Sequence, residues 1–213
     1  MELFGIRDPD VTLTDYAITL LCLWVIWRIV VGQRFGRVRF WMLVFYVGVG
    51  LGAAFGGTVH GFFDVEGTPG NDILWPASLI SIGLAAFGAW GMGARLVLRD
   101  QLASGLIGMT GLVFVIYSGV VISGSRSFAV AVAHYLPAAI FLLGALVVAH
   151  RRSPHSGFRE ALVGLVLTFV AAAIQQRQVA IHAVYFDHNA LYHLVQAVAL
   201  VLIYRGVTRA LRA

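Results

Sequence analysis

The feature that most constrains the fold of this chain is a series of apolar segments, each about as long as a membrane is thick. A helix needs roughly 20 consecutive apolar residues to cross about 30 Å of hydrocarbon. Seven such segments follow one another along the 213 residues, at 11–31, 40–62, 73–98, 102–122, 128–149, 160–182 and 189–208. The sequence therefore predicts an all-α polytopic membrane protein with seven transmembrane helices.

The composition indicates one transmembrane domain over residues 1–213. The mean hydropathy is +0.86 and only 12% of residues are charged, whereas a soluble globular domain carries about 25%. The connecting segments leave no room for a soluble module. The first apolar segment lacks the basic n-region and the small-residue cleavage site of a signal peptide, so we expect it to be retained as a helix.

The basic and sulfur-containing residues exclude several classes of protein. All 15 basic residues are arginine. A retinal Schiff base needs a lysine, so a photoactive rhodopsin is excluded. The arginines lie in short connections between apolar segments, which indicates a role in membrane topology and no binding of nucleic acid. The single cysteine, Cys22, cannot form an intramolecular disulfide bond.

The distribution of arginine predicts the orientation in the membrane, because cytoplasmic loops are enriched in basic residues. One side carries most of them: Arg28, Arg34, Arg37, Arg39, Arg95, Arg99, Arg151, Arg152, Arg159, Arg205, Arg209 and Arg212. The other side carries Arg7, Arg126 and Arg177 and most of the acids: Glu2, Asp8, Asp10, Asp64, Glu66, Asp72 and Asp187. We therefore expect an outer N-terminus and a cytoplasmic C-terminus, in the plasma (inner) membrane of a bacterium, with membrane lipids as partners.

Glycines recur at helical spacing in two of the segments. Gly48, Gly52 and Gly56 share one face of the second segment, and Gly105, Gly108 and Gly111 line the fourth. Small residues allow helices to approach closely in a membrane, where no hydrophobic force drives them together. We expect these stripes to be helix contacts.

Polar residues converge on the predicted outer ends of the helices. Five of the seven histidines lie there, accompanied by three aspartates: His60, His134, His182, His188 and His193, with Asp64, Asp72 and Asp187. Ionisable groups at membrane depth are costly and usually mark a functional site. The sequence therefore predicts a His/Asp site at the outer-leaflet end of the bundle.

Imidazole is the commonest zinc ligand, and a catalytic zinc uses three protein ligands and one water. His60 and His193 are the deepest candidates, and His188 is the expected third ligand. Additional candidate ligands are His182, Asn189 and His134, although His182 and His188 also suit interfacial loops and His134 also suits an interhelical hydrogen bond. Asp187 is a natural N-cap for the last helix. Candidate substrate contacts are Arg177, Gln178 and Tyr192.

Three short motifs resemble those of the CREST superfamily, the seven-helix membrane hydrolases that include alkaline ceramidases and adiponectin/progestin receptors. Gly56–His60 is similar to the family's span-2 motif, Asp72 follows as the family's aspartate does, and Asn189–His193 is similar to the span-7 motif. The family's serine is replaced by Gly56, and the first histidine of its span-7 pair by Asn189. The resemblance implies zinc held by one histidine of span 2 and two of span 7.

The resemblance also implies a zinc-dependent hydrolase. Zinc polarises a carbonyl and activates a bound water. Asp72 or Asp64 is the expected general base, and His60, His188 and His193 are the expected ligands. Since the site lies toward the outer leaflet, a lipid amide or ester is the expected substrate.

Two other functions suit the same residues. A non-enzymatic sensor, receptor-like protein or small-solute transporter uses histidines as groups that respond to pH or to a ligand. A haem protein uses two histidines as axial ligands, here His60 and His193. Metal analysis and a visible spectrum of the purified protein distinguish the three.

Overall fold

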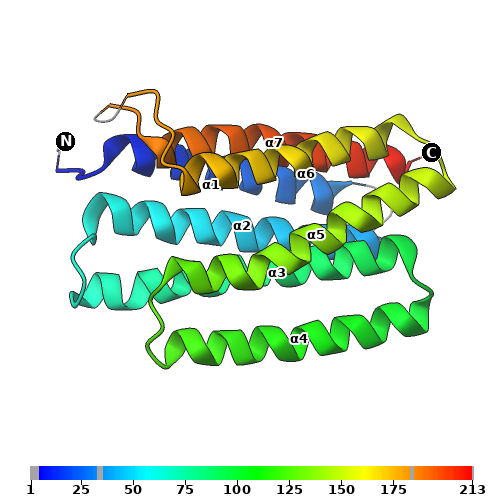
Figure 1. Cartoon of the computed structure of the whole chain (residues 1–213), viewed down its shortest axis with the longest axis horizontal. Helices are drawn as coiled ribbons and strands as arrows, with labels where there is room; N and C mark the ends of the chain where they lie inside the picture. The colour runs from blue at the N-terminus through cyan, green and yellow to red at the C-terminus, as the bar shows by residue number, and fades with distance from the viewer. Residues whose placement is uncertain (1–4, 33–35, 183–184, 213) are drawn as a thin grey trace.

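The computed structural model describes residues 5–32, 36–182 and 185–212, and these ranges contain seven α-helices. They are α1 (Pro9–Val31), α2 (Arg37–Phe62), α3 (Pro69–Val97), α4 (Asp100–Ile122), α5 (Phe128–Arg152), α6 (Ser156–Gln176) and α7 (His188–Ala210) (Figure 1). All seven are long and apolar enough to cross a membrane. The predicted all-α class with seven transmembrane helices is confirmed. Glu2 and Arg34 lie outside the described residues.

Six of the helices form a ring, and the seventh lies outside it. Neighbours pack in the order α1, α2, α3, α5, α6 and α7, and α1 closes the ring against α7. Helix α4 packs on α3 at the edge of the molecule (Figure 1). Consecutive helices run in opposite directions, so both the α2–α3 and the α6–α7 connections lie at the end where α1 begins.

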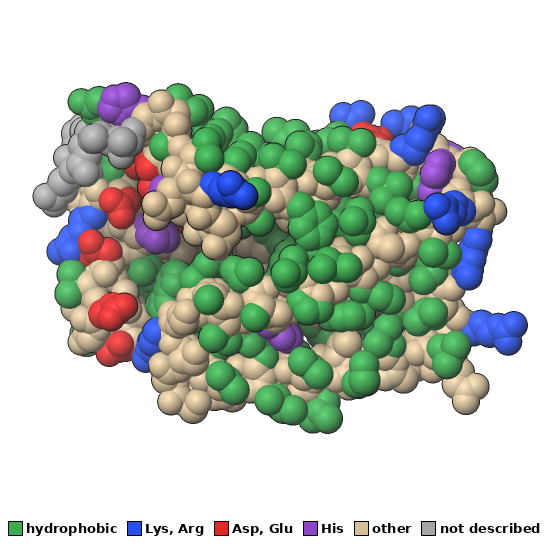
Figure 2. Space-filling view, in the orientation of Figure 1, with side chains coloured by type: hydrophobic (Ala, Val, Ile, Leu, Met, Phe, Trp, Pro, Cys, Tyr) green, Lys and Arg blue, Asp and Glu red, His purple; other side chains and the backbone are tan. Residues whose placement is uncertain are grey.

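The two ends of the bundle differ in charge. Most arginine side chains gather at the end where the chain terminates, whereas most of the visible acidic side chains lie at the opposite end (Figure 2). The asymmetry that the sequence indicated is therefore a property of the folded molecule. An outer N-terminus and a cytoplasmic C-terminus remain the orientation that this charge asymmetry predicts.

Glycine allows the closest approach between α2 and α3. A Cβ atom added to Gly48 would lie 2.4 Å from the backbone nitrogen of Ala85, and one added to Gly88 would lie 2.4 Å from that of Phe45. Helices α6 and α7 meet in the same way, since a Cβ on Gly206 would lie 2.4 Å from the Ala161 nitrogen. Of the predicted stripe Gly48, Gly52 and Gly56, only Gly48 makes such a backbone contact, and an added Cβ at the other two would make ordinary contacts.

Two expectations differ from the structure. At Gly105 and Gly108 no described atom lies within 4 Å of an added Cβ, so that part of the α4 stripe faces away from the described helices. The sixth helix ends at Gln176 and not near residue 182. The backbone of Gln178 has a φ of 53°, a left-handed conformation that ends a helix although the residues beyond it are apolar.

The half of the ring toward the C-terminal end is filled by apolar side chains. Cys22, Val25, Phe45, Leu200 and Ile203 are among the most deeply buried residues and belong to one continuous core cluster. This core lies between the arginine-rich end and the polar residues at the end where α1 begins.

Candidate functional site

The most deeply buried carboxylate of the outer half is Asp15 on α1. Its residue is only 5% exposed. It lies six residues after the start of α1 at Pro9, which corresponds to about 9 Å along the helix axis. A carboxyl group at this depth inside a membrane bundle needs a partner of opposite charge, a bound cation or a proton of its own.

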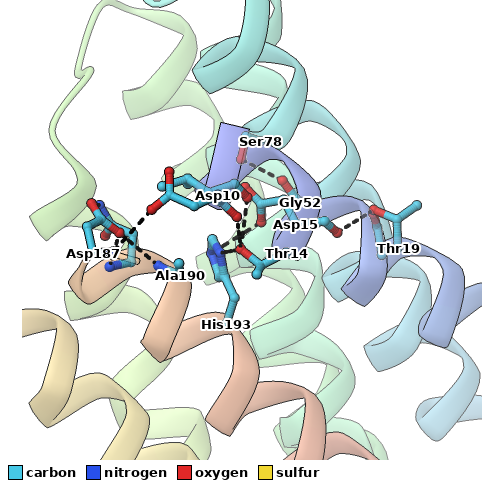
Figure 3. A network of polar contacts seen from close by, with 12 residues as sticks. Asp10, Thr14, Asp15, Thr19, Gly52, Ser78, Asp187, Ala190 and His193 are labelled. Atoms are coloured by element: carbon cyan, nitrogen blue, oxygen red, sulfur yellow. Dashed lines mark hydrogen bonds and ion pairs between the residues drawn. The ribbon is translucent and has the colours of Figure 1, made fainter. Parts of the chain in front are cut away.

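The partner of Asp15 is His193 on α7. The His193 Nε2 atom lies 3.2 Å from the Asp15 Oδ1 atom, and both side chains are almost completely buried. The other ring nitrogen, Nδ1, lies 3.0 Å from the hydroxyl of Thr14. Figure 3 shows that these three side chains meet between α1 and α7. The site thus joins the first and last helices of the ring.

The contacts of Thr14 allow two tautomers of His193. In one, the Thr14 hydroxyl donates to the carbonyl of Asp10 at 2.8 Å and its oxygen accepts from Nδ1–H of His193. The Nε2 lone pair then faces a carboxylate oxygen 3.2 Å away, and a proton or a metal ion between the two acceptors is required. In the other, the Thr14 hydroxyl donates to Nδ1, and Nε2–H donates to Asp15.

His60 on α2 completes the set of ionisable groups. Its side chain lies near enough to His193 for their charges to interact, and its ring lies 6.3 Å from that of Trp75 on α3. His60 and His193, predicted to share one depth, are therefore neighbours. Asp15 lies on the helix that packs against both of theirs.

Two further aspartates, Asp187 and Asp10, hold the start of α7. Asp187 caps the helix, because its Oδ1 atom accepts hydrogen bonds from the backbone of Asn189 at 2.8 Å and of Ala190 at 2.9 Å. The backbone nitrogen of Asp187 donates to Oδ2 of Asp10 on α1 at 3.1 Å. The predicted N-cap is confirmed. These bonds set the register between α7 and α1, and hence between His193 and Asp15 (Figure 3).

The predicted third ligand and its alternatives lie nearer the surface. His188 lies 3.8 Å from Asp187 Oδ2, and the Asn189 side chain donates to the same atom at 3.4 Å. His182 lies in the α6–α7 connection, with its ring 4.7 Å from that of Tyr185. His134 on α5 stacks on Tyr117 of α4, with ring centroids 4.2 Å apart.

The two aspartates expected as general bases are paired with arginines at the outer surface. Asp72 lies 3.7 Å from Arg126, which also donates to the Asp72 carbonyl at 3.1 Å. Asp64 forms an ion pair with Arg7. Both carboxylates are far more exposed than Asp15. The geometry favours Asp15 as the carboxylate of the site.

The predicted substrate contacts lie on both sides of the α6–α7 connection. Arg177 caps α6, and its backbone donates to the Ala173 carbonyl at 2.9 Å. Gln178 follows in the left-handed conformation. Tyr192 lies beside the site, with its ring 5.0 Å from that of His193.

A three-ligand metal site is not assembled in the described part of the chain. No three histidine, cysteine, aspartate or glutamate side chains in residues 5–32, 36–182 and 185–212 come together as a set that could hold a metal ion. Asp15 and His193 provide two donors in contact. His60 lies on α2, and α1, which carries Asp15, packs against both α2 and α7.

Comparison with known proteins assigns the chain to a family. A family model described as a family of unknown function, DUF6962, matches residues 11–212. The chain belongs to the DUF6962 family. No curated protein and no solved structure matches this DUF6962 chain. The matched region contains Asp15, His60 and His193, so the site lies within the family domain.

Sequence reasoning missed Asp15 and Thr14, although one signal was present. Asp15 is an acidic residue inside the apolar segment 11–31, and such a residue marks a site by itself. The histidines drew attention because they are numerous at one end of the bundle. The partner of His193 depends on how α1 is rotated against α7, which a single apolar segment does not reveal.

Proposed function

We propose that this chain is an integral-membrane hydrolase that acts on a lipid amide or ester and uses a zinc ion near Asp15 and His193. The observation that carries the proposal is the 3.2 Å contact between His193 Nε2 and Asp15 Oδ1. Two ligands of one tetrahedral zinc, each bonded at about 2.0–2.1 Å, lie about 3.3 Å apart. The pair therefore has the spacing of two zinc ligands, and His60 is the proposed third.

The surroundings of His193 support a role as a metal ligand. A ligating histidine usually donates its second ring N–H to a hydrogen-bond acceptor, which sets the tautomer and the ring orientation. Thr14 provides this acceptor, so the Nε2 lone pair points toward Asp15. When bound, zinc would supply a Lewis acid and an activated water.

The position of the site supports a lipid substrate from the outer leaflet. The apolar core that includes Val25, Phe45 and Ile203 closes the bundle below the site. One face of the molecule is hollowed between α5 and α6, with apolar side chains around the hollow (Figure 2). We propose the same orientation as before, with the N-terminus outside and the C-terminus in the cytoplasm of a bacterial cell, in its plasma (inner) membrane.

The test compares two carboxylates. Asp15→Asn should lose bound zinc, and hydrolysis of a fluorescent lipid amide or ester should be lost with it, because the substitution removes a proposed zinc ligand. Asp100→Asn is the matched control, because Asp100 lies exposed at the other end of the bundle and pairs with Arg37. It should keep both zinc and activity. Measurements use metal analysis and hydrolysis in proteoliposomes.

Asp72→Asn separates this proposal from the role that the sequence predicted for Asp72. If Asp15 acts in the site, Asp72→Asn keeps zinc and most of the activity. If Asp72→Asn abolishes hydrolysis and Asp15→Asn does not, the general base is Asp72 and the proposal for Asp15 is wrong. Wild-type protein without zinc and without hydrolysis would contradict the hydrolase itself.

A second candidate function follows from the same contact. A proton between Nε2 and Oδ1 satisfies both atoms as a zinc ion does, and the pair links the first and last helices of the ring. A metal-free protein with this pair would be a sensor of outer pH, since the apolar core blocks the path to the cytoplasm. Metal-free wild-type protein whose structure changes with pH would favour this function, and a Soret band would favour haem.

A further inference from the structure

A small open space lies beside Asp15 at the position of Gly56 on α2. A Cβ atom added to Gly56 would lie 3.4 Å from the hydroxyl oxygen of Ser78 and 3.6 Å from Oδ2 of Asp15. These are the nearest atoms found around that point. The position therefore accepts a methyl group in ordinary van der Waals contact, and two polar atoms border it.

This space has a different role from the glycine contacts around it. An added Cβ would lie 2.4 Å from the Ala85 backbone at Gly48 and 2.7 Å from the Asp15 Cβ at Gly57. Glycine at those two positions is required for helix packing. At Gly56 the backbones are not in such contact, so the packing of α2 does not explain the missing side chain.

Both polar atoms at the space are hydrogen-bond acceptors. Ser78 donates its hydroxyl proton to the carbonyl of Gly52 at 2.9 Å, so its oxygen has lone pairs for another donor (Figure 3). Asp15 contacts His193 through Oδ1. Among the residues that the structure describes, no donor contacts its Oδ2 atom. A carboxylate oxygen without a donor among the described residues favours a ligand that donates hydrogen bonds.

We propose that Gly56 keeps open a water-binding site between Asp15 and Ser78. A water needs two to four polar partners in a buried site, and these two side chains provide two. Because both accept, the water donates both of its hydrogens to them and its own lone pairs point away. The role of this water as the hydrolytic nucleophile rests on the proposed function, whereas its binding does not.

The first test fills the space without disturbing the packing. Gly56→Ala should retain zinc but lower hydrolysis about 100-fold, as expected when a reacting water loses its position beside the Asp15 carboxylate. Ser78→Ala, which adds no volume, should also retain zinc and lose about tenfold, in keeping with loss of one hydrogen bond to a bound water. Gly52→Ala is the matched control, since its added Cβ would make only ordinary contacts, the nearest at 3.5 Å to Ile82. Full activity in both Gly56→Ala and Ser78→Ala would overturn the proposal.

The second test is independent of hydrolysis. In a Cys22→Ser background, Ser78→Cys places the only thiol at the edge of the space. Hydrogen peroxide in the outer solution should oxidise this thiol, as measured by mass spectrometry of the peptide that contains it. Adding Gly56→Ala should slow the oxidation at least tenfold, and adding Gly52→Ala should not. Equal rates in all three proteins would overturn the water site, while an inactive wild type with the expected rates would contradict only the hydrolase.

Discussion

At the scale of residues, the site consists of one hydrogen-bond relay across two helices. Thr14 donates to the Asp10 carbonyl and hydrogen-bonds Nδ1 of His193, and Nε2 of His193 faces Asp15. Each member sets the orientation of the next. The metal proposal thus depends on a threonine that does not itself contact the metal.

Thr14→Val tests this dependence. The valine keeps the β-branched shape but removes the hydroxyl, so Nδ1 of His193 loses its acceptor and the ring loses its fixed tautomer. Loss of such a contact usually costs 10–100-fold in metal affinity. We expect zinc affinity to fall by about this factor in a titration with a competing chelator. Thr110→Val on α4 is the control, because Thr110 bonds only to carbonyls of its own helix among the described residues. Unchanged affinity in Thr14→Val would contradict the relay.

At the scale of helices, the α2–α3 contact positions His60 and Ser78 on neighbouring elements. Gly48 and Gly88 allow the two backbones to touch. Gly48→Ala would place a methyl group against the backbone of α3 at Ala85. Overpacking of this kind lowers the free energy of unfolding by about 1–3 kcal/mol. We expect a lower thermal unfolding temperature in detergent micelles. Gly108→Ala on α4, where an added Cβ meets no described atom, should leave this temperature unchanged, and equal values for both variants would contradict the close contact.

The helices were largely predictable from the sequence, and the site only in part. In a membrane the backbone must satisfy its own hydrogen bonds, so an apolar segment of sufficient length has few alternatives to a helix. The end of α6 was placed too late because Val179 and Ile181 are apolar, although the backbone turns at Gln178. His60 and His193 were expected to lie together, because depth follows from position along a helix. Asp15 was not, because its direction depends on helix rotation.

At the scale of the whole molecule, the charge asymmetry predicts the side on which the site opens. The arginine-rich end carries the C-terminus (Figures 1 and 2). Asp15 lies near the start of α1 and hence toward the opposite end. A reporter protein that folds only in the cytoplasm should therefore be active when it is fused after Ala213. The same reporter in the α2–α3 connection should be inactive. The reverse pattern would place the site at the inner leaflet and contradict a substrate from the outer one.

The most direct test of the central claim is X-ray absorption at the zinc edge on the purified protein. We predict about one zinc per chain, with nitrogen and oxygen ligands at about 2.0–2.1 Å and scattering from imidazole rings. His193→Ala should remove this signal, whereas His155→Ala, at the start of α6 on the arginine-rich end, should not. Protein that binds no zinc after growth with added zinc, or a signal unchanged in His193→Ala, would contradict the claim that Asp15 and His193 hold a metal ion.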